Sequence, residues 1–319
     1  MTIQQPTATD LGPVLSASVM RETPRGVSAP LRRTSFTTVR RVLRTRMTPL
    51  ALAILAVFAL VAVFANQVQR YDPINYQSYA SANQGPSLEH WFGTDYLGRD
   101  TWSRLVHGSR ISLFVGVISV GVGLSVGVLV GVSAGYLGGK VDALLMRCTD
   151  AIWAFPALML ALAITSALGR GVVNSMIAIG IVGIPFYARL ARASTLAARE
   201  FDYTLAARAL GASTPRILAR HILPNIAAPL IVQASLGLGT AIITEASLSF
   251  LGVGVQPPTP SWGLELRTGY QYLELNPVVA IIPGVLIFLT VLAFNFLGDG
   301  LRTALDPRLA TQTSPRSRA

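Results

Sequence analysis

Six apolar stretches, each about as long as a bilayer is thick, constrain this sequence more than any other feature. A transmembrane helix needs about 20 mostly apolar residues, because each residue adds about 1.5 Å along the helix axis. Charged residues make up only 13% of the 319 residues, against roughly a quarter in soluble domains. We therefore predict an all-α, polytopic integral membrane protein with six transmembrane helices. The expected spans are approximately residues 47–66, 111–134, 151–168, 172–190, 225–248 and 278–297.

The basic residues orient these spans. With the N-terminus inside, 20 of the 26 Lys and Arg residues fall on the inner side and six fall on the outer side. Short inner loops of membrane proteins carry an excess of Lys and Arg, so both termini are expected in the cytoplasm. The same bias explains most of the formal net charge of +11. Because the arginines lie in short loops and no RNA- or DNA-binding motif accompanies them, nucleic acid is not an expected partner.

Both ends of the chain differ in composition from the apolar middle. Residues 1–46 are rich in Ser, Thr, Pro and Ala and show no helical periodicity, so we predict a disordered, basic cytoplasmic tail. Its last arginines, directly before the first span, should meet anionic lipid head groups. The polar region is too long for a cleaved signal peptide, so the first span is expected to stay as an anchor. Residues 47–310 then form the membrane domain, and residues 311–319 a flexible C-terminal tail.

Several kinds of chemistry are excluded by what the chain lacks. A P-loop ends in Gly-Lys-Ser/Thr because its lysine must reach the terminal phosphates. The only lysine, Lys140, stands in Gly-Gly-Lys-Val, without that hydroxyl residue. Of all Asp, Glu, Lys and His residues, Glu245 alone falls within the expected spans, which is too few for a proton relay. Sodium sites built from backbone and hydroxyl oxygens leave little trace in a sequence. One cysteine, Cys148, and three scattered histidines argue against a metal site. We expect neither a catalytic nor a metal site.

A stripe of small residues follows one face of the second span. Small residues four apart let another helix approach closely. We interpret the stripe as a packing surface, with a helix of a partner chain among the candidate neighbours, and not as a phosphate-binding loop. Its members are Ser119, Gly123, Gly127, Gly131 and Gly135.

The long inner loop, residues 192–224, is expected to form a bent element outside the bilayer. Residues 198–210 favour a helix that Gly211 ends, and Thr214 can cap a second helix with Pro215 in its first turn. Pro224 is expected to break that second helix. The alanines of the first limb leave little bulk, so the limb can dock into a groove. A connector that rests on lipid head groups is the alternative. Four arginines ring the element: Arg199, Arg208, Arg216 and Arg220.

This loop resembles the coupling loop of bacterial ABC importer permeases, Glu-Ala-Ala-x3-Gly-x9-Ile-x-Leu-Pro. Two positions depart from that pattern, because Leu205 stands in place of the glutamate and His221 in place of the isoleucine. The His-x-Leu-Pro-Asn ending is similar to the peptide-importer branch of the family. By this resemblance the coupling residues are Leu205, Ala206, Ala207, Gly211, His221, Leu223 and Pro224.

Three further stretches resemble the second permease subunit of dipeptide and oligopeptide (nickel) importers. The first runs from Phe92 to Asp100 and on to Leu113, the second from Glu245 to Gly263, and the third from Asn295 to Arg308. All of them occur in the order of that family, and the resemblance covers roughly residues 40 to 310.

The resemblance implies the ABC type I importer permease fold and one half of an ATP-driven path for di- and oligopeptides. It also implies a multi-pass chain in the bacterial inner membrane, in contact with lipid. The expected partners are a second permease subunit, two ATPase subunits and an extracytoplasmic substrate-binding protein. ATP and Mg²⁺ would be bound by the ATPase subunits, so this chain needs no cofactor of its own. Import of nickel chelates or another small solute is the alternative within the fold, and a self-contained carrier or channel is the alternative from another class.

Three local expectations concern single residues. Asp100 is expected to cap a short interfacial helix, residues 101–106, with Trp102 as a membrane anchor. Such an anchor and direct contact with a delivery protein are equally open. Glu245 is expected to line the solute path or to cap Ser247 and Ser249, and a structural or gating role is favoured. Asp299 is expected to pair with Arg302.

Overall fold

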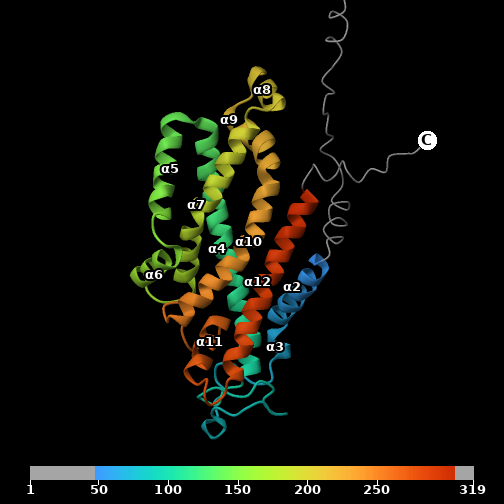
Figure 1. Cartoon of the computed structure of the whole chain (residues 1–319), viewed down its shortest axis with the longest axis vertical. Helices are drawn as coiled ribbons and strands as arrows, with labels where there is room; N and C mark the ends of the chain where they lie inside the picture. Colours follow the sequence, from blue (N-terminus) through green and yellow to red (C-terminus); the bar gives the residue numbers. More distant parts are fainter. Residues whose placement is uncertain (1–46, 306–319) are drawn as a thin grey trace, which may run out of the picture. The chain divides into compact units, whose positions relative to one another are not determined.

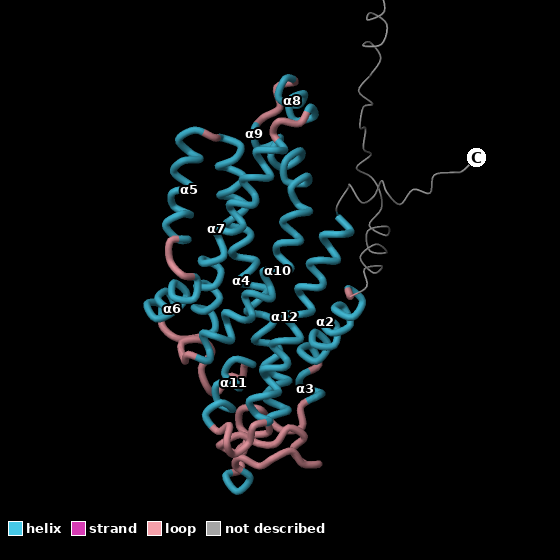
Figure 2. The backbone as a smooth tube through the Cα atoms, in the orientation of Figure 1, coloured by secondary structure: helices cyan, strands magenta, loops and turns pink. Residues whose placement is uncertain are grey.

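The computed structural model describes residues 47–305, and within them it is helical, with an isolated bridge between Thr94 and Asp100 in place of strands (Figures 1 and 2). Both expected tails, and the expected lipid contact of the first, lie outside the described residues. The α-helices are α2 (Thr48–Val63), α3 (Ala65–Val68), α4 (Thr101–Leu137), α5 (Gly139–Trp153), α6 (Ala157–Leu168), α7 (Val172–Ala198), α8 (Asp202–Ala209), α9 (Thr214–Ile217), α10 (Leu223–Phe250), α11 (Trp262–Gln271) and α12 (Val278–Leu305).

Four of the six expected spans correspond to helices that are long and apolar enough to cross a bilayer. Within residues 47–305 these are α4, α7, α12 and the run Thr214–Phe250, which contains α10. The first expected span is α2, which is apolar but has only 16 residues, or about 24 Å of helix.

The third expected span, 151–168, is not one straight helix. It is the second half of a pair, α5 and α6, whose axes meet at 89°. Pro156 stands at the N-cap of α6. Proline restrains the residue before it to extended backbone, so a helix tends to end there. α5 already begins at Gly139, whereas α6 ends at Leu168 and α7 begins at Val172, as the expected spans do.

Close packing of α4 on α7 forms the largest helix interface in the described part. Gly123, Gly127 and Gly131 all face α7. A β carbon added to Gly127 would lie 2.7 Å from the β carbon of Tyr187 and 2.8 Å from the carbonyl oxygen of Ile184. The small-residue stripe therefore packs within the chain, and its neighbour is α7 and not a helix of a partner chain.

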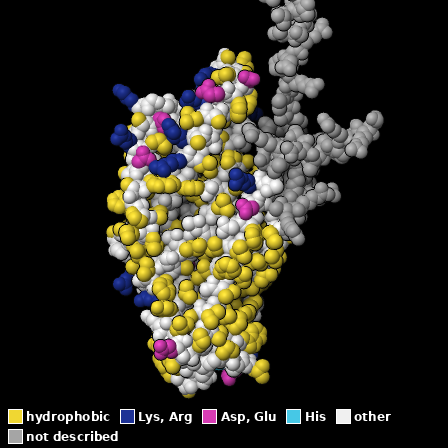
Figure 3. All heavy atoms as spheres, in the orientation of Figure 1, with side chains coloured by type: hydrophobic (Ala, Val, Ile, Leu, Met, Phe, Trp, Pro, Cys, Tyr) yellow, Lys and Arg dark blue, Asp and Glu magenta, His cyan; other side chains and the backbone are white. Residues whose placement is uncertain are grey.

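Charge is distributed unevenly over the surface. Lys and Arg side chains gather toward the end that carries α8, whereas much of the opposite half of the visible face is hydrophobic (Figure 3). The end with α8 is therefore the inner side given by the Lys and Arg bias.

Candidate functional site

The element α8–α9 projects beyond the ends of the neighbouring helices (Figure 1). We call residues 201–217 the hook. Its first limb ends at Gly211, whose φ is 76°. The N–H of Gly211 donates to the carbonyl of Arg208, and the N–H of Ala212 donates to that of Ala207, both at 3.0 Å. This pair of bonds is a Schellman ending, which favours glycine at the left-handed position. The first limb thus ends where the sequence predicts, although α8 begins only at Asp202.

The second limb does not end at Pro224, contrary to the expectation. α9 starts one residue early, with Ser213 and not Thr214 at its N-cap, and Pro215 lies in its first turn. A π-helical segment, Leu218–Ile222, then leads directly into α10. Pro224 lies directly after this segment, at the start of α10. The wider π-helical turn accommodates the proline. The side-chain amide of Asn225 donates a hydrogen bond to the carbonyl of His221 at 2.6 Å.

The hook exposes large apolar side chains to the aqueous side. Leu210 at its turn is 88% exposed, Phe201 51% and Leu205 43%. Its base is anchored, because Ile217 is buried in an apolar cluster with residues of α4 and α7. Exposed apolar surface on a firmly held element is typical of a protein–protein contact. Of the seven expected coupling residues, Ala207 and His221 are half-buried, and the others are exposed: Leu205, Ala206, Gly211, Leu223 and Pro224.

Sequence reasoning missed Leu210, which is the most exposed apolar side chain of the hook. A signal was present, because Leu210 directly precedes the glycine that ends α8.

A cavity of about 550 Å³ opens between the α5–α6 break, α7 and α10. Trp153, Phe155 and Phe186 supply aromatic walls, and Gln233 and Thr240 supply polar groups. The described residues that line it include no charged side chain. Its size lies within the range of small-molecule sites. Sequence reasoning did not find this cavity, because its lining comes from five helices, α4, α5, α6, α7 and α10, and contains no charged side chain.

Glu245 lies outside this cavity and is fully buried. Ser249 donates to its Oε1 at 2.8 Å, and the hydroxyl of Ser112 on α4 lies 3.4 Å from its Oε2. The structure therefore places Glu245 in the packing between α10 and α4. The expected contact with Ser247 is absent, because that hydroxyl donates to the carbonyl of Ile243 at 2.8 Å.

The expected pair of Asp299 and Arg302 is wrong. No ion pair joins these two residues of α12 in the described part of the chain. The carbonyl of Asp299 instead accepts a bond from the hydroxyl of Thr303 at 2.9 Å.

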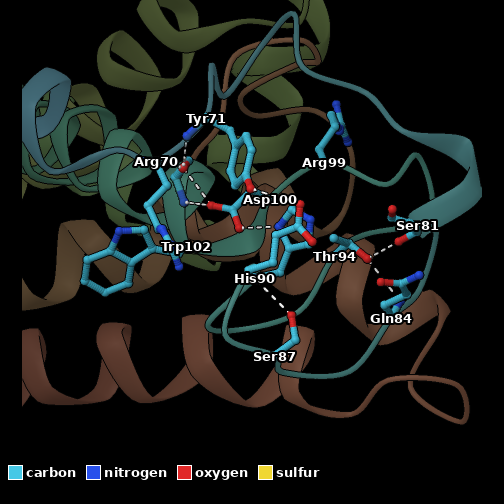
Figure 4. A network of polar contacts seen from close by, with 12 residues as sticks. Arg70, Tyr71, Ser81, Gln84, Ser87, His90, Thr94, Arg99, Asp100 and Trp102 are labelled. Carbon is cyan, nitrogen blue, oxygen red and sulfur yellow. Dashed lines mark hydrogen bonds and ion pairs between the residues drawn. The ribbon is translucent and has the colours of Figure 1, made fainter.

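The segment before α4 is held by buried polar contacts (Figure 4). Asp100 Oδ2 accepts from the backbone N–H of Ser103 at 2.9 Å, which confirms the expected cap, and Asp100 Oδ1 lies 2.9 Å from His90 Nδ1. The capped helix is not a short interfacial one, since α4 continues to Leu137. The indole N–H of Trp102 donates to the carbonyl of Val68 at 3.1 Å, so this side chain joins the first turn of α4 to the end of α3.

A buried ion pair ties this segment to α11. Arg104 Nε and Nη2 donate to Glu265 Oε1 at 3.0 and 2.7 Å, and Nη1 donates to the carbonyl of Pro73 at 2.7 Å. Both charged side chains are 1% exposed. The pair joins residues 161 positions apart, so it fixes the outer loops onto the membrane helices.

We predict that Glu265→Gln destabilises the chain by about 3 kcal/mol, because it leaves a buried guanidinium without its main counter-charge. Thermal unfolding of the purified protein in detergent measures the effect. The matched control is Glu200→Gln, whose carboxylate is 66% exposed and pairs with Arg199 at 2.8 Å. The control should cost less than about 1 kcal/mol. Equal stability of the two variants would contradict a structural role for the buried pair.

Comparison with known proteins extends these observations. Residues 127–311 match the family described as binding-protein-dependent transport system inner membrane component. The chain is 47% identical over 270 residues to the glutathione transport system permease protein GsiD of Escherichia coli O6:K15:H31 (strain 536 / UPEC), covering 85% of this chain and 89% of that protein. GsiD of Shigella boydii serotype 4 (strain Sb227) gives the same values.

The fold also resembles that of a solved transporter. The match to a structure of the MetNI methionine ABC transporter in an inward facing conformation covers 64% of this chain and 97% of the matched chain. The TM-score is 0.53 and the sequence identity is 22%. A second crystal form of that transporter gives a TM-score of 0.51 and 23% identity.

Proposed function

The chain belongs to the family of binding-protein-dependent transport system inner membrane components, and from this premise we propose that it conducts a peptide-like solute across the membrane. Permeases of this family are multi-pass inner-membrane subunits of ABC importers. They are not catalytic, since ATP is hydrolysed by partner subunits.

The observation that carries the choice of solute is the 47% identity, over 85% of the chain, to a permease named for glutathione transport. Glutathione is itself a small peptide. The four motifs shared with the dipeptide and oligopeptide branch agree with this choice. The cavity of about 550 Å³ has room for a solute of that size.

We further propose that the hook is the part of the chain that engages an ATPase subunit. Leu205 and Leu210 are exposed on it, and Ala206 leaves room for close approach. The buried Ile217 and Ile222 hold its base against α4 and α7, so a force on the hook reaches the membrane helices. These features favour docking over a connector that rests on head groups, because the tip carries apolar groups and not only arginines.

The remaining partners follow from the same proposal. Trp153 and Phe155 are 47% and 60% exposed around the cavity, and a second permease subunit would close that open side. An extracytoplasmic binding protein would deliver the solute, and two ATPase subunits would bind ATP and Mg²⁺. Lipid would cover the apolar outer faces of α2 and α12.

Reconstitution tests the proposal. We expect proteoliposomes with this chain, its second permease, its ATPases and its binding protein to take up glutathione and trialanine only when ATP is present. A variant ATPase subunit without its P-loop lysine is the control and should abolish uptake. ATP-independent uptake by this chain alone would overturn the importer role. ATP-driven uptake of a nickel chelate with no uptake of either peptide would replace the solute and leave the permease role standing.

A further inference from the structure

We propose that a polar stripe on α10, made by Gln233, Thr240 and Thr244, is the wall along which the solute moves. We infer that the stripe hydrogen-bonds to the uncharged amide groups of a peptide and not to its charges. This inference rests on the proposed function and assigns the solute contacts within it.

The stripe follows from helix geometry. Gln233, Gly237, Thr240 and Thr244 are spaced by four, three and four residues, which places them on one face of a helix, and all four line the cavity. Thr244 donates its hydroxyl proton to the carbonyl of Thr240 at 2.9 Å, so its hydroxyl oxygen is left to act as a hydrogen-bond acceptor.

Gln233 is the member with unused capacity. Its side-chain amide makes no hydrogen bond to any described residue of the chain. A glutamine amide offers both donors and an acceptor. Its NH₂ group can therefore donate to the carbonyl of a peptide bond while its oxygen accepts from the N–H of one. Exposure of this group to hydrocarbon would cost several kcal/mol, so this face of α10 is turned toward water and not toward lipid.

The break between α5 and α6 supports a wet cavity independently. Residues 152–157 around the break line the cavity, and the bend leaves backbone groups of both helix ends without helical partners. Irregular backbone at membrane depth is tolerated only where it is buried in protein or lines a water-filled space. Broken helices are also a frequent feature of solute sites in transporters.

One charged pair contacts the cavity wall through the ring of Trp153. Arg189 lies over the ring of Trp153 at 4.2 Å and donates to Asp150 at 2.7 Å. The lining itself is neutral, with Trp153 stacked on Phe186 at a centroid distance of 6.0 Å. A wall of this kind cannot retain a solute by ion pairing, so it favours passage and release over tight binding. We therefore infer that the wall is indifferent to the sign of the charge on a peptide.

A charge introduced at position 233 should make uptake depend on the charge of the peptide. In the reconstituted complex, Gln233→Glu should raise the ratio of Ala-Lys-Ala uptake to Ala-Glu-Ala uptake about tenfold, and Gln233→Lys should lower it by a similar factor, since a charge in a confined site acts at short range. Any preference of the binding protein cancels, because the same binding protein serves every variant. The matched controls are Thr303→Glu and Thr303→Lys, on an exposed position of α12 outside the cavity, and they should leave the ratio unchanged.

The outcomes separate the inference from the proposed function. An unchanged ratio in active Gln233 variants would overturn the wall and leave the peptide importer intact. Failure of the wild-type complex to move either tripeptide would overturn the proposed function itself, and the inference with it.

If the Gln233 variants do not transport at all, cysteine labelling decides. In a Cys148→Ser background, Thr240→Cys should react with a charged, membrane-impermeant thiosulfonate, and excess trialanine should slow that reaction. The control is Phe288→Cys, at an α12 position that is 62% exposed and outside the cavity, and it should not react. Absence of labelling at position 240 would overturn the inference.

Discussion

Replacement of Gly131 by valine is expected to prevent stable accumulation of the chain in the membrane. A β carbon at this position would overlap the carbonyl oxygen of Ala188 and lie 2.8 Å from the β carbon of Ala191. The backbone of α7 cannot yield to it without separating from α4 along their whole interface. Overpacking of this kind costs about 3 kcal/mol or more, a large share of the total stability of a typical domain.

The same helix offers a matched control. Gly121 also lies on α4, but it is exposed, and a β carbon added there meets nothing within 4 Å. Gly121→Val should therefore accumulate to the wild-type level. The amount of protein in the membrane fraction and its thermal unfolding in detergent are the measurements. Equal loss in the two variants would point to a general intolerance of valine in α4 and would refute close packing as the reason for Gly131.

Leu210→Asp is expected to release the ATPase subunits from the complex while the chain stays folded. Leu210 is 88% exposed, so its substitution removes few contacts within the chain and should change the stability of the chain little. Burial of one leucine in a partner is worth about 1.5–3 kcal/mol, and a buried unpaired carboxylate adds a further penalty. Together these effects correspond to at least a tenfold weaker association, which co-purification of the ATPase subunits and ATP-driven uptake both measure.

Leu88→Asp provides the control for this surface. Leu88 is 94% exposed, but it lies in the loops before α4, away from the hook. Its substitution should leave co-purification of the ATPase subunits unchanged. Gly211→Val, at a φ of 76° that valine avoids, should misplace Leu210 and weaken the association by geometry. Retention of the ATPase subunits by both hook variants would disprove the docking role.

The transmembrane helices could be predicted because their signal is local. Apolar runs gave α4, α7, α10 and α12, and the four-residue spacing of small side chains gave the packing face of α4. The neighbour of that face could not be predicted, since a small-residue stripe specifies close approach but not the helix that approaches.

Prolines show where local reasoning ends. Pro185, Pro229 and Pro283 all lie inside continuous helices, whereas Pro156 stands at an 89° bend. The four look alike in the sequence, because each occurs within an apolar run. Whether a helix continues through a proline depends on how its neighbours satisfy the freed backbone groups, and that information lies in the tertiary structure.

The hook could be predicted in part and the cavity not at all. Glycine adopts the left-handed conformation that ends a helix, so Gly211 allowed the end of α8 to be predicted from the sequence. The contact of Arg104 with Glu265 and the convergence of Trp153, Phe186 and Gln233 join separate helices. Contacts between residues on separate helices cannot be predicted from the spacing of those residues along the chain.

Continuity between the second limb of the hook and α10 has a mechanical consequence. Thr214–Phe250 runs as one helix of 37 residues, about 55 Å from end to end. A rod of that length converts a tilt of about 10° at one end into a displacement of roughly 10 Å at the other. Thr214 and Thr244 thus lie on one helix, so that a tilt at Thr214 displaces Thr244. The π-helical turn at Leu218–Ile222 lies between them and is the point where this helix can bend. If the hook engages an ATPase subunit as proposed, the stiffness of this π-helical turn would set how much of a movement of the hook reaches the part of α10 at mid-membrane.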